Sequence, residues 1–251
     1  MPMRFRTIVL TAALLGTALL AGCTSAPSSR ATHAEAAPAE SWDAFLLPTP
    51  YATIVVQPYY AAPFEPGPDV MEVLAAAMTQ MTPKPVRLAE PIQLHVPRVV
   101  GKEWTTEELD AVMRAASPLD FGEYGLSDEA ILEVYYLDGF GPGRSVGLEV
   151  DGRTFIFGVG IADLPPAARF EKERRTLVHE FGHAIGLVNC GIPMVTARED
   201  VNQPCHSVAR YSVMRQATVA FDQDPVEVNA LNWQFDEDDI ADVRTYQASF
   251  A

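Results

Sequence analysis

Two histidines and a glutamate stand at a spacing that can hold a metal ion and use it. His179, Glu180 and His183 form the pattern His-Glu-x-x-His. Residues four apart share one face of a helix, so both imidazoles can reach one ion. Glu180 lies beside the first ligand, where a carboxylate can take a proton from metal-bound water. The pattern predicts a zinc metallopeptidase, and the alternative is a buried helix that carries two histidines by chance.

The residues around the motif predict that it lies on a buried helix over about 169–187. Apolar side chains recur at the spacing of one helical face. They are Leu177, Val178, Phe181, Ala184, Ile185 and Leu187. A helix packed in this way would hold the two histidines rigidly, as a metal site requires.

The rest of residues 42–251 predicts a single α/β (α+β) domain that positions this helix. Strand patterns fall at 53–56, 92–96, 131–137 and 153–161. Helical patterns fall at 68–81, from about 105, and at 236–248. Thr105 and Glu108 have the spacing of a capping box. Strands with interleaved helices predict a twisted mixed sheet.

Three further features of this region receive ordinary structural interpretations. His95 falls on the polar phase of its strand, which predicts a surface residue and not a ligand. The glycine-rich segment 139–143 is interpreted as a turn, because no Lys-Ser/Thr pair or helix follows it directly. The strand at 153–161 lies just before the metal helix. At a sheet edge it could pair with an extended substrate backbone.

The first 22 residues have the pattern of an export signal. Arg4 and Arg6 precede a short apolar run and small residues. Residues 20–23, Leu-Ala-Gly-Cys, resemble a bacterial lipobox, which implies cleavage before Cys23 and lipidation of its thiol. Residues 23–41 are rich in Ala, Ser and Pro and predict a disordered tether. With Thr24 after the cysteine, the resemblance implies a lipid anchor in the bacterial cell envelope, at the outer membrane.

The charge of the chain excludes some partners. Its formal net charge is −15 at pH 7. Such a surface argues against nucleic acid and against anionic lipid as partners. It leaves a peptide or protein substrate open, with at most a weak preference for basic peptides.

The region from about 171 to 248 resembles the metzincin peptidases, and the matrixins among them. Their motif is His-Glu-x-x-His-x-x-Gly-x-x-His followed by a Met-turn. This chain matches the glycine at Gly186, and Ser212-Val213-Met214 looks like the Met-turn. Residues 235–240 resemble the start of the last matrixin helix. The resemblance implies a zincin/metzincin-like catalytic domain that binds Zn²⁺, with Glu180 as general base and Met214 as an apolar floor.

The chain departs from that pattern at the third ligand, where Asn189 replaces histidine. His206 lies eight residues before Met214, the spacing of the matrixin third ligand. With Cys23 assigned to lipid, Cys190 and Cys205 are an even pair for an oxidising compartment. A disulfide between them would bring His206 to the place of Asn189. We therefore expect His206 to be the third metal ligand; Asn189 with water, or Glu199, are the alternatives.

The sequence thus predicts a zinc-dependent endopeptidase. Two alternatives remain at this point. One is a catalytically inactive zinc-binding or interaction lipoprotein with the same fold, although zinc binding alone does not need Glu180. The other is a structural lipoprotein, in which buried histidines and a glutamate without metal would be costly.

Overall fold

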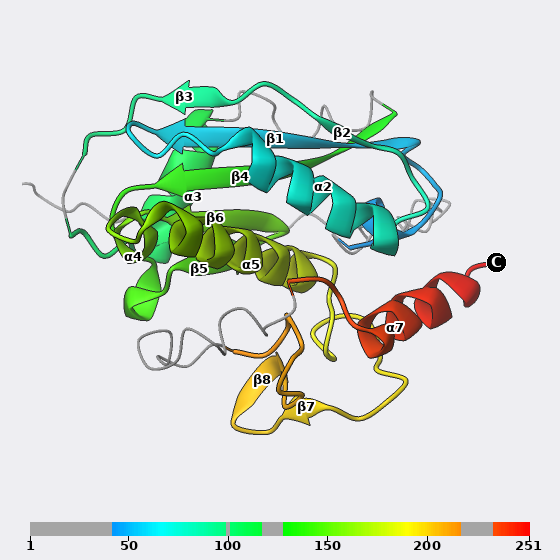
Figure 1. Ribbon diagram of the computed structural model, residues 1–251. Helices are drawn as coiled ribbons and strands as arrows, with labels where there is room; N and C mark the ends of the chain where they lie inside the picture. Colours follow the sequence, from blue (N-terminus) through cyan, green and yellow to red (C-terminus); the bar gives the residue numbers. More distant parts are fainter. Residues whose placement is uncertain (1–41, 99–100, 117–127, 217–232) are drawn as a thin grey trace, which may run out of the picture. The chain divides into compact units, whose positions relative to one another are not determined.

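A mixed six-stranded sheet lies at the centre of the part of the chain that the structure describes (Figure 1). The structure is a computed structural model that describes residues 42–98, 101–116, 128–216 and 233–251. All of these belong to one compact unit, residues 38–251. The expected signal peptide, the lipidation site Cys23 and the tether lie outside the described residues.

The sheet is parallel except for one edge strand. Its order is β2-β1-β4-β6-β5. Strand β3 also pairs with β1, on the same side as β2 but farther along β1. Only the β5–β6 pair is antiparallel within it. The strands are β1 (Thr53–Ala61), β2 (Val86–Leu88), β3 (Ile92–Leu94), β4 (Glu129–Leu137), β5 (Gly147–Val150) and β6 (Arg153–Phe157). With its helices, this twisted sheet confirms the expected mixed α/β fold class.

Strand β1 is longer than the predicted 53–56 because it continues through Pro58. Proline lacks the N–H that a central strand normally donates. On one side of β1, β2 pairs only with residues 54–56 and β3 only with 59–61. Pro58 lies between these two pairings, and the side chain of Gln57 donates to its carbonyl at 3.1 Å. Pro58 therefore interrupts neither of these two pairings, and on the other side of β1 it stands opposite Val134 of β4.

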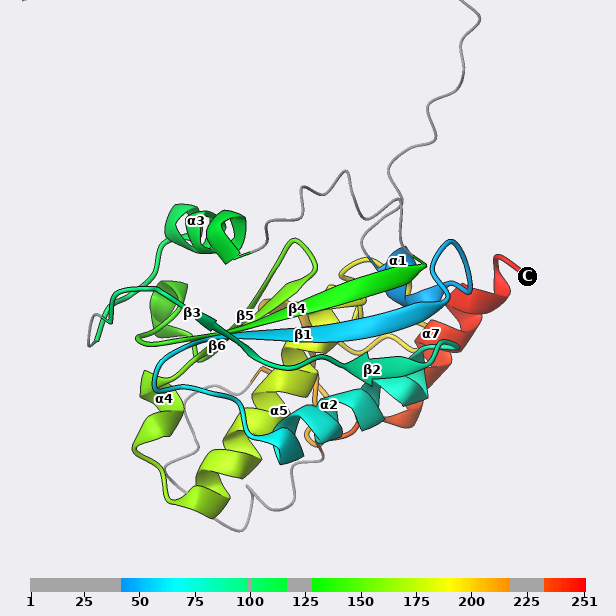
Figure 2. The same cartoon turned by 90° about the horizontal axis from the view of Figure 1, so that it is seen from above.

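Helices cover both faces of the sheet (Figure 2). One face carries α2 (Pro68–Met81) and the long α5 (Pro166–Ala184), which bury the larger apolar core together with α1 (Asp43–Leu46). The opposite face carries α3 (Thr106–Ala116) over stacked rings of Tyr59, Tyr135 and Phe155. Burial of these apolar surfaces is the main stabilising term of such a fold.

After α5, the helix that carries the histidine motif, the described chain forms a small hairpin and a last helix. The hairpin consists of β7 (Glu199–Asp200) and β8 (Gln203–Ser207), and the last helix is α7 (Glu237–Ala248). Helix α7 begins with a capping box formed by Asp236 and Asp239. The reciprocal hydrogen bonds of the predicted capping box, Thr105 with Glu108, are also present at the start of α3.

The prediction for residues 153–161 is wrong in two respects. Strand β6 ends at Phe157, and α4 (Val159–Ala162) follows, because Gly158 packs against the ring of Phe64 and the chain turns there. Moreover, β6 is interior, paired on both sides by β4 and β5. The strand at the sheet edge beside α5 is β5, which has no clear alternating pattern and was not predicted.

His95 follows β3 directly and is exposed, as the sequence predicted. Among the described residues, no helix combines the length and the apolar character that crossing a membrane requires.

Candidate metal centre

Helix α5 presents the first two histidines toward one point. His179 and His183 lie one turn apart near its C-terminal end, and their Nε2 atoms are 3.1 Å apart. Two nitrogens bound tetrahedrally to one zinc at 2.0–2.1 Å are about 3.3 Å apart. Leu177, Val178 and Phe181 on the other side of the helix are fully buried in the core and hold it in place.

The third histidine of this cluster comes from the hairpin. His206 on β8 places its ring 5.2 Å from that of His179 and 4.8 Å from that of His183. One ligand atom from each of the three lies within 4.8 Å of the others. Within the described ranges, this is the only group of three or more His, Cys, Asp or Glu residues that could hold a metal ion.

Hydrogen bonds orient two of these rings. Nδ1 of His179 lies 2.7 Å from the carbonyl oxygen of Val213, and Nδ1 of His206 lies 2.9 Å from that of Pro204. A carbonyl only accepts, so Nδ1 is the protonated nitrogen in both rings. Their Nε2 lone pairs are then directed away from the backbone, as in histidines that bind metals.

The end of α5 explains how the chain reaches the hairpin. Gly186 has φ +74°, a left-handed conformation that favours glycine, and the Leu187 N–H donates to the Gly182 carbonyl at 3.0 Å. A Cβ on Gly186 would lie 3.0 Å from the Cα of Gly191. The glycine of the motif is therefore needed to end the helix and to let the following loop pass close by.

A disulfide joins Cys190 and Cys205, which closes the loop between the helix and the third histidine. Glu199 strengthens the neck of this loop: one carboxylate oxygen accepts the Cys205 N–H at 3.0 Å, and the other accepts the Asn189 side-chain amide at 3.1 Å. Asn189 and Glu199 are thus bonded to each other, and neither belongs to the histidine cluster. Of the three candidate ligands, His206 is the one that the structure brings to His179 and His183.

A buried ion cluster fixes the same loop to the last helix. Arg198 donates to Asp239 at 2.8 Å and to Asp242 at 2.6 Å, and all three side chains are buried. The Arg198 carbonyl also accepts the N–H of Val208, two residues after His206. Because breaking a buried ion pair is strongly destabilising, this cluster holds the hairpin firmly against α7.

Met214 packs against helix α5 in the interior of the protein. Its side chain is fully buried, and a Cβ on Gly182 would lie 2.2 Å from its sulfur. The turn around it is closed by Ser212, whose hydroxyl accepts the Met214 N–H at 3.1 Å. The same turn supplies the Val213 carbonyl that orients His179. The expected role of Met214 as an apolar floor fits this packing.

The side chain of Glu180 is closely packed between its own helix, α5, and strand β5. It is 7% exposed, and a Cβ on Gly147 would lie 2.4 Å from its Oε1. Burial, and next the charge of Glu149, raise the pKa of Glu180 to about 8. A cation nearby favours the ionised form of a carboxylate and would bring this pKa down toward neutrality, the range suited to a general base.

Burial lowers the pKa of His179 to about 4 and that of His183 well below its usual value. Both rings are therefore neutral at pH 7, which is the state that binds a metal. A cluster of three imidazoles suits Zn²⁺, which takes nitrogen ligands in tetrahedral geometry and keeps a fourth position open at catalytic sites.

The low pKa of His179 gives an expected pH dependence for the metal-free protein. The unfolded chain protonates this ring near pH 6.5 and the folded chain only near pH 4, so stability falls as pH drops between these values. Because the ring is half-buried, we expect the free energy of unfolding to fall by about 2 kcal/mol between pH 7 and pH 4.5. Urea unfolding of EDTA-treated protein at pH 7 and pH 4.5 measures it. His179→Asn should remove this part of the loss, and His95→Asn should not; equal losses in both variants would contradict the assignment.

Removal of the disulfide is expected to weaken both the fold and the metal site. The bridge spans 15 residues, and closing such a loop stabilises by about 3 kcal/mol in the chain-entropy model. Since the bridge also positions His206, the double variant Cys190→Ser, Cys205→Ser should bind zinc about tenfold more weakly, at the low end for lost supporting contacts. Competition with a chromophoric chelator measures the affinity. Unchanged affinity would mean that the Arg198 cluster alone holds the hairpin.

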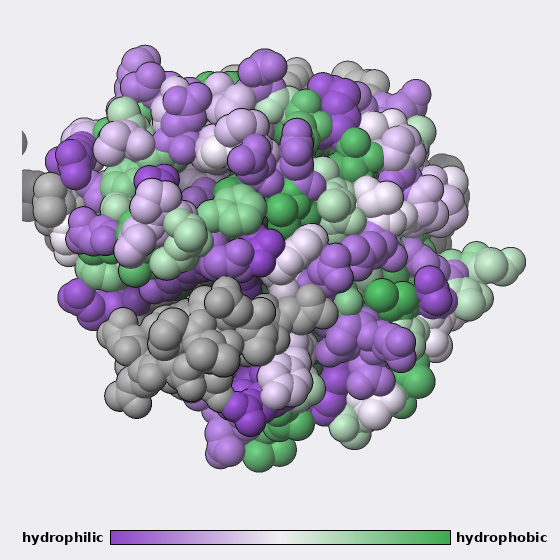
Figure 3. Space-filling model, viewed as in Figure 1, coloured by the Kyte–Doolittle hydropathy of each residue, from purple (hydrophilic) through white to green (hydrophobic). Residues whose placement is uncertain are grey.

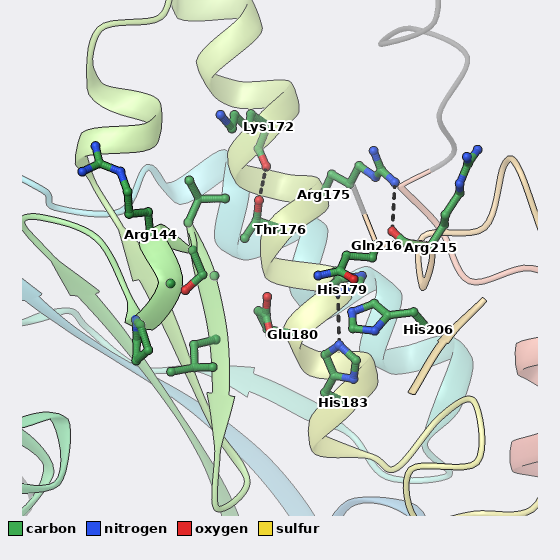
Figure 4. Close-up of a pocket in the computed structure, with 16 residues that line it drawn as sticks. Arg144, Lys172, Arg175, Thr176, His179, Glu180, His183, His206, Arg215 and Gln216 are labelled. Carbon is green, nitrogen blue, oxygen red and sulfur yellow. Dashed lines mark hydrogen bonds between the residues drawn. The ribbon is translucent and has the colours of Figure 1, made fainter. Parts of the chain in front are cut away.

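A cavity of about 630 Å³ opens in front of the histidines, within the usual range for ligand sites (Figure 4). Its walls come from α5, from β5 with the turn before it, and from the residues after Met214. Sequence reasoning missed several of its residues, because it interpreted segment 139–143 as an ordinary turn. That segment leads into the short helix η2 (Pro142–Arg144) and then β5, and the residues from Pro142 onward line the cavity.

Four basic residues of the cavity were also missed. They are Arg144, Lys172, Arg175 and Arg215. A signal for one of them was present in the sequence: Lys172, Thr176 and Glu180 are spaced by four and so share one face of the metal helix.

The solved structures with a similar fold include those of three peptidases. The archaemetzincin of Methanopyrus kandleri has a TM-score of 0.48 at 14% identity, covering 78% of this chain and 94% of that one. A zinc-dependent peptidase of Methanocorpusculum labreanum gives 0.47 at 16%, covering 75% and 99%. The archaemetzincin of Archaeoglobus fulgidus, complexed with malonate, gives 0.41 at 16%, covering 76% and 99%. No protein-family model and no curated protein matches the sequence. At these identities and TM-scores, the likeness assigns no role to any residue of this chain.

Proposed function

We propose that this protein is a zinc-dependent endopeptidase whose metal is held by His179, His183 and His206. The observation that carries the proposal is the convergence of three imidazoles beside a buried carboxylate with a raised pKa. Zinc ligation alone does not require Glu180, whereas peptide hydrolysis requires a base at that place. The same arrangement disfavours an inactive zinc-binding or interaction protein.

When bound, Zn²⁺ supplies a Lewis acid that activates water and polarises the scissile carbonyl. The residues of the chain do the remaining work. The Glu180 carboxylate accepts the proton of the attacking water and passes it to the nitrogen of the leaving amine. Val213 and Pro204 keep the histidine rings oriented through their carbonyls. Met214 and the buried face of α5 keep water from the underside of the site.

The position of β5 supports an extended peptide as substrate. This strand is last in the sheet order, so one of its edges pairs with no described strand. Gly147 and Leu148 of β5 line the cavity, and Gly147 lies against Glu180. An extended chain can add to such an edge through backbone hydrogen bonds. A substrate bound in this way would pass the metal centre along its length, which favours cleavage within a chain.

Peptides blocked at both ends test the endopeptidase proposal. Zinc-loaded full-length protein is incubated with a mixture of peptides that are acetylated at the N-terminus and amidated at the C-terminus. Mass spectrometry then locates new termini. We expect internal cleavage of blocked peptides. Cleavage restricted to unblocked peptides, one or two residues from an end, would contradict endopeptidase action and leave an exopeptidase.

We further propose that Cys23 carries the lipid that anchors the protein in a bacterial cell envelope, with 23–41 as a tether. The lipobox-like sequence Leu-Ala-Gly-Cys supports this. The intact mass of the mature protein should show a lipid-modified N-terminal cysteine, and Cys23→Ala should release the protein from the membrane fraction. An unmodified Cys23 would contradict the anchor.

A further inference from the structure

The charge of the cavity is opposite to the charge of the whole chain. The chain has 18 basic and 33 acidic residues. Among the residues that the structure describes, in contrast, four basic side chains line the cavity, and Glu180 is the one carboxylate. A cavity lined by one sign of charge concentrates ligands of the other sign. The net charge of the chain would favour basic peptides, whereas the charge of this cavity favours acidic ones.

The four basic residues lie on one side of Glu180. Figure 4 shows all of them on the side away from His183, with Arg144 and Arg215 at opposite edges and Lys172 and Arg175 between them. Lys172 and Arg175 come from α5, Arg144 from η2, and Arg215 follows Met214. We call these four residues the basic subsite. Three separate segments of the chain thus contribute positive charge to the lining of one cavity.

The neighbouring acids of α5 are directed to other arginines. Glu171 is paired with Arg174, and Glu173 is paired with Arg169 at 3.6 Å. Neither of these arginines lines the cavity. The helix thus has acidic residues close to the basic subsite in sequence, yet they do not line this end of the cavity.

Two arginines of the subsite interact with each other. Arg175 is buried, and its guanidinium donates to the Arg215 carbonyl at 3.4 Å. Burial and the charge of Arg215 lower the pKa of Arg175 to about 10, which still leaves it charged at pH 7. Two positive charges that act on each other in this way attract an anion more strongly than either does alone.

On the face of the molecule seen in Figure 3, the described residues offer no large apolar surface for recognition. Among the residues coloured in Figure 3, apolar ones occur singly or in small groups on the face seen there. Guanidinium groups match carboxylates in geometry and bind them through paired hydrogen bonds. A carboxylate is the anion that peptides carry, either on an Asp or Glu side chain or at the C-terminus.

The distance between the basic subsite and the metal centre corresponds to a number of residues in an extended substrate. Arg175 precedes His179 by one helical turn and Lys172 precedes Glu180 by about two, which is roughly 6 to 12 Å along the axis. An extended peptide rises about 3.3 Å per residue. That interval therefore corresponds to about two to four residues of substrate.

We propose that the basic subsite binds a carboxylate of the substrate, two to four residues to one side of the bond that is cleaved. This inference rests on the proposed function for the position of the cleaved bond, but binding of the carboxylate itself is independent of cleavage. The preferred substrates are then peptides with an acidic side chain, or a free C-terminus, at that distance.

Three fluorescent pools of ten-residue peptides test this binding. The first contains Asp and Glu and is amidated; the second has Asn and Gln in their place and is amidated; the third is the second with a free C-terminus. Anisotropy measures their affinity for zinc-loaded full-length Glu180→Gln protein, which is not expected to cleave them. We expect the first or the third pool to bind about tenfold more tightly than the second, and the comparison shows which carboxylate is bound.

Arg144 and Arg215 are exposed and suit substitution. The double variant Arg144→Gln, Arg215→Gln should reduce that preference to within about twofold, whereas Arg114→Gln with Arg244→Gln, which removes two exposed charges outside the cavity, should keep it. Equal binding of all pools, no binding of either acidic pool, or a preference that survives the double variant would overturn the inference. Incubation of the pools with unsubstituted protein separates the two proposals: charge-dependent binding without any cleavage contradicts only the peptidase, and cleavage without a charge preference contradicts only the subsite.

Discussion

Replacement of Glu180 by glutamine is expected to lower kcat/KM for peptide hydrolysis by about 10²- to 10⁴-fold, the usual contribution of a general base. Glutamine has nearly the same size but cannot accept the proton of the attacking water. Zinc binding should remain, because Glu180 is not one of the three clustered histidines. The fold should also remain: a neutral amide replaces a carboxyl whose pKa burial raises to about 8.

The experiment measures zinc content, thermal unfolding and the initial rate on one fluorogenic peptide for each variant. The matched control is Glu149→Gln, because Glu149 is the carboxylate whose charge acts on Glu180. Loss of that charge should change the pH profile and cost far less activity than Glu180→Gln. Activity within tenfold of the unsubstituted protein in zinc-loaded Glu180→Gln would remove Glu180 from the mechanism.

The second large effect is expected from the third histidine. His206→Ala should weaken zinc binding by at least about 100-fold, the upper end of what the loss of a mere supporting contact causes. Asn189→Ala is the matched control, because it alters the position where the family motif has its third ligand. It removes a hydrogen bond to Glu199 and no member of the histidine cluster.

Zinc affinity of both variants is measured by chelator competition on full-length protein with an intact disulfide. Glu199→Gln completes the set, since it removes the alternative carboxylate ligand and keeps an oxygen for the Cys205 N–H. We expect a large loss in His206→Ala alone. If Asn189→Ala or Glu199→Gln lost zinc while His206→Ala kept it, the ligand set would be wrong.

The parts of the site that depend on local spacing could be predicted from the sequence. Helical periodicity fixes the relation of His179 to His183, and Gly186 ends the helix because its backbone is left-handed. The position of His206 was predicted from its spacing to Met214, which resembles that of the matrixin third ligand, and from a pair of cysteines whose bridge would bring it to the place of Asn189. The cleavage and lipidation expected at Cys23 remain predictions.

The parts that depend on contacts between distant segments could not be predicted. Arg198 meets Asp239 and Asp242 across more than 40 positions, and nothing in the sequence near either end indicates the pairing. Strand β5 is four residues long and half-buried on both faces, so it lacks the alternation by which strands are recognised. The error at 153–161 has the same origin: apolar β-prone residues continue past Phe157, but the chain turns into α4 after Gly158, which packs against the distant residue Phe64.

The basic subsite shows why composition was a poor indicator of ligand. Its residues come from η2, from α5 and from the segment after Met214, and only the fold brings them to one cavity. Apart from Glu180, the described acidic residues that dominate the net charge do not line this cavity. Net charge acts on solubility and on long-range encounter instead.

The account is tested most directly by titration of metal-free, full-length protein with zinc while cleavage of a blocked fluorogenic peptide is followed. We expect no cleavage without metal, a linear rise with added zinc, and a plateau at one zinc per chain. Binding of one zinc at the three histidines with no cleavage at any zinc level would contradict the peptidase and favour a zinc-binding protein with the same fold.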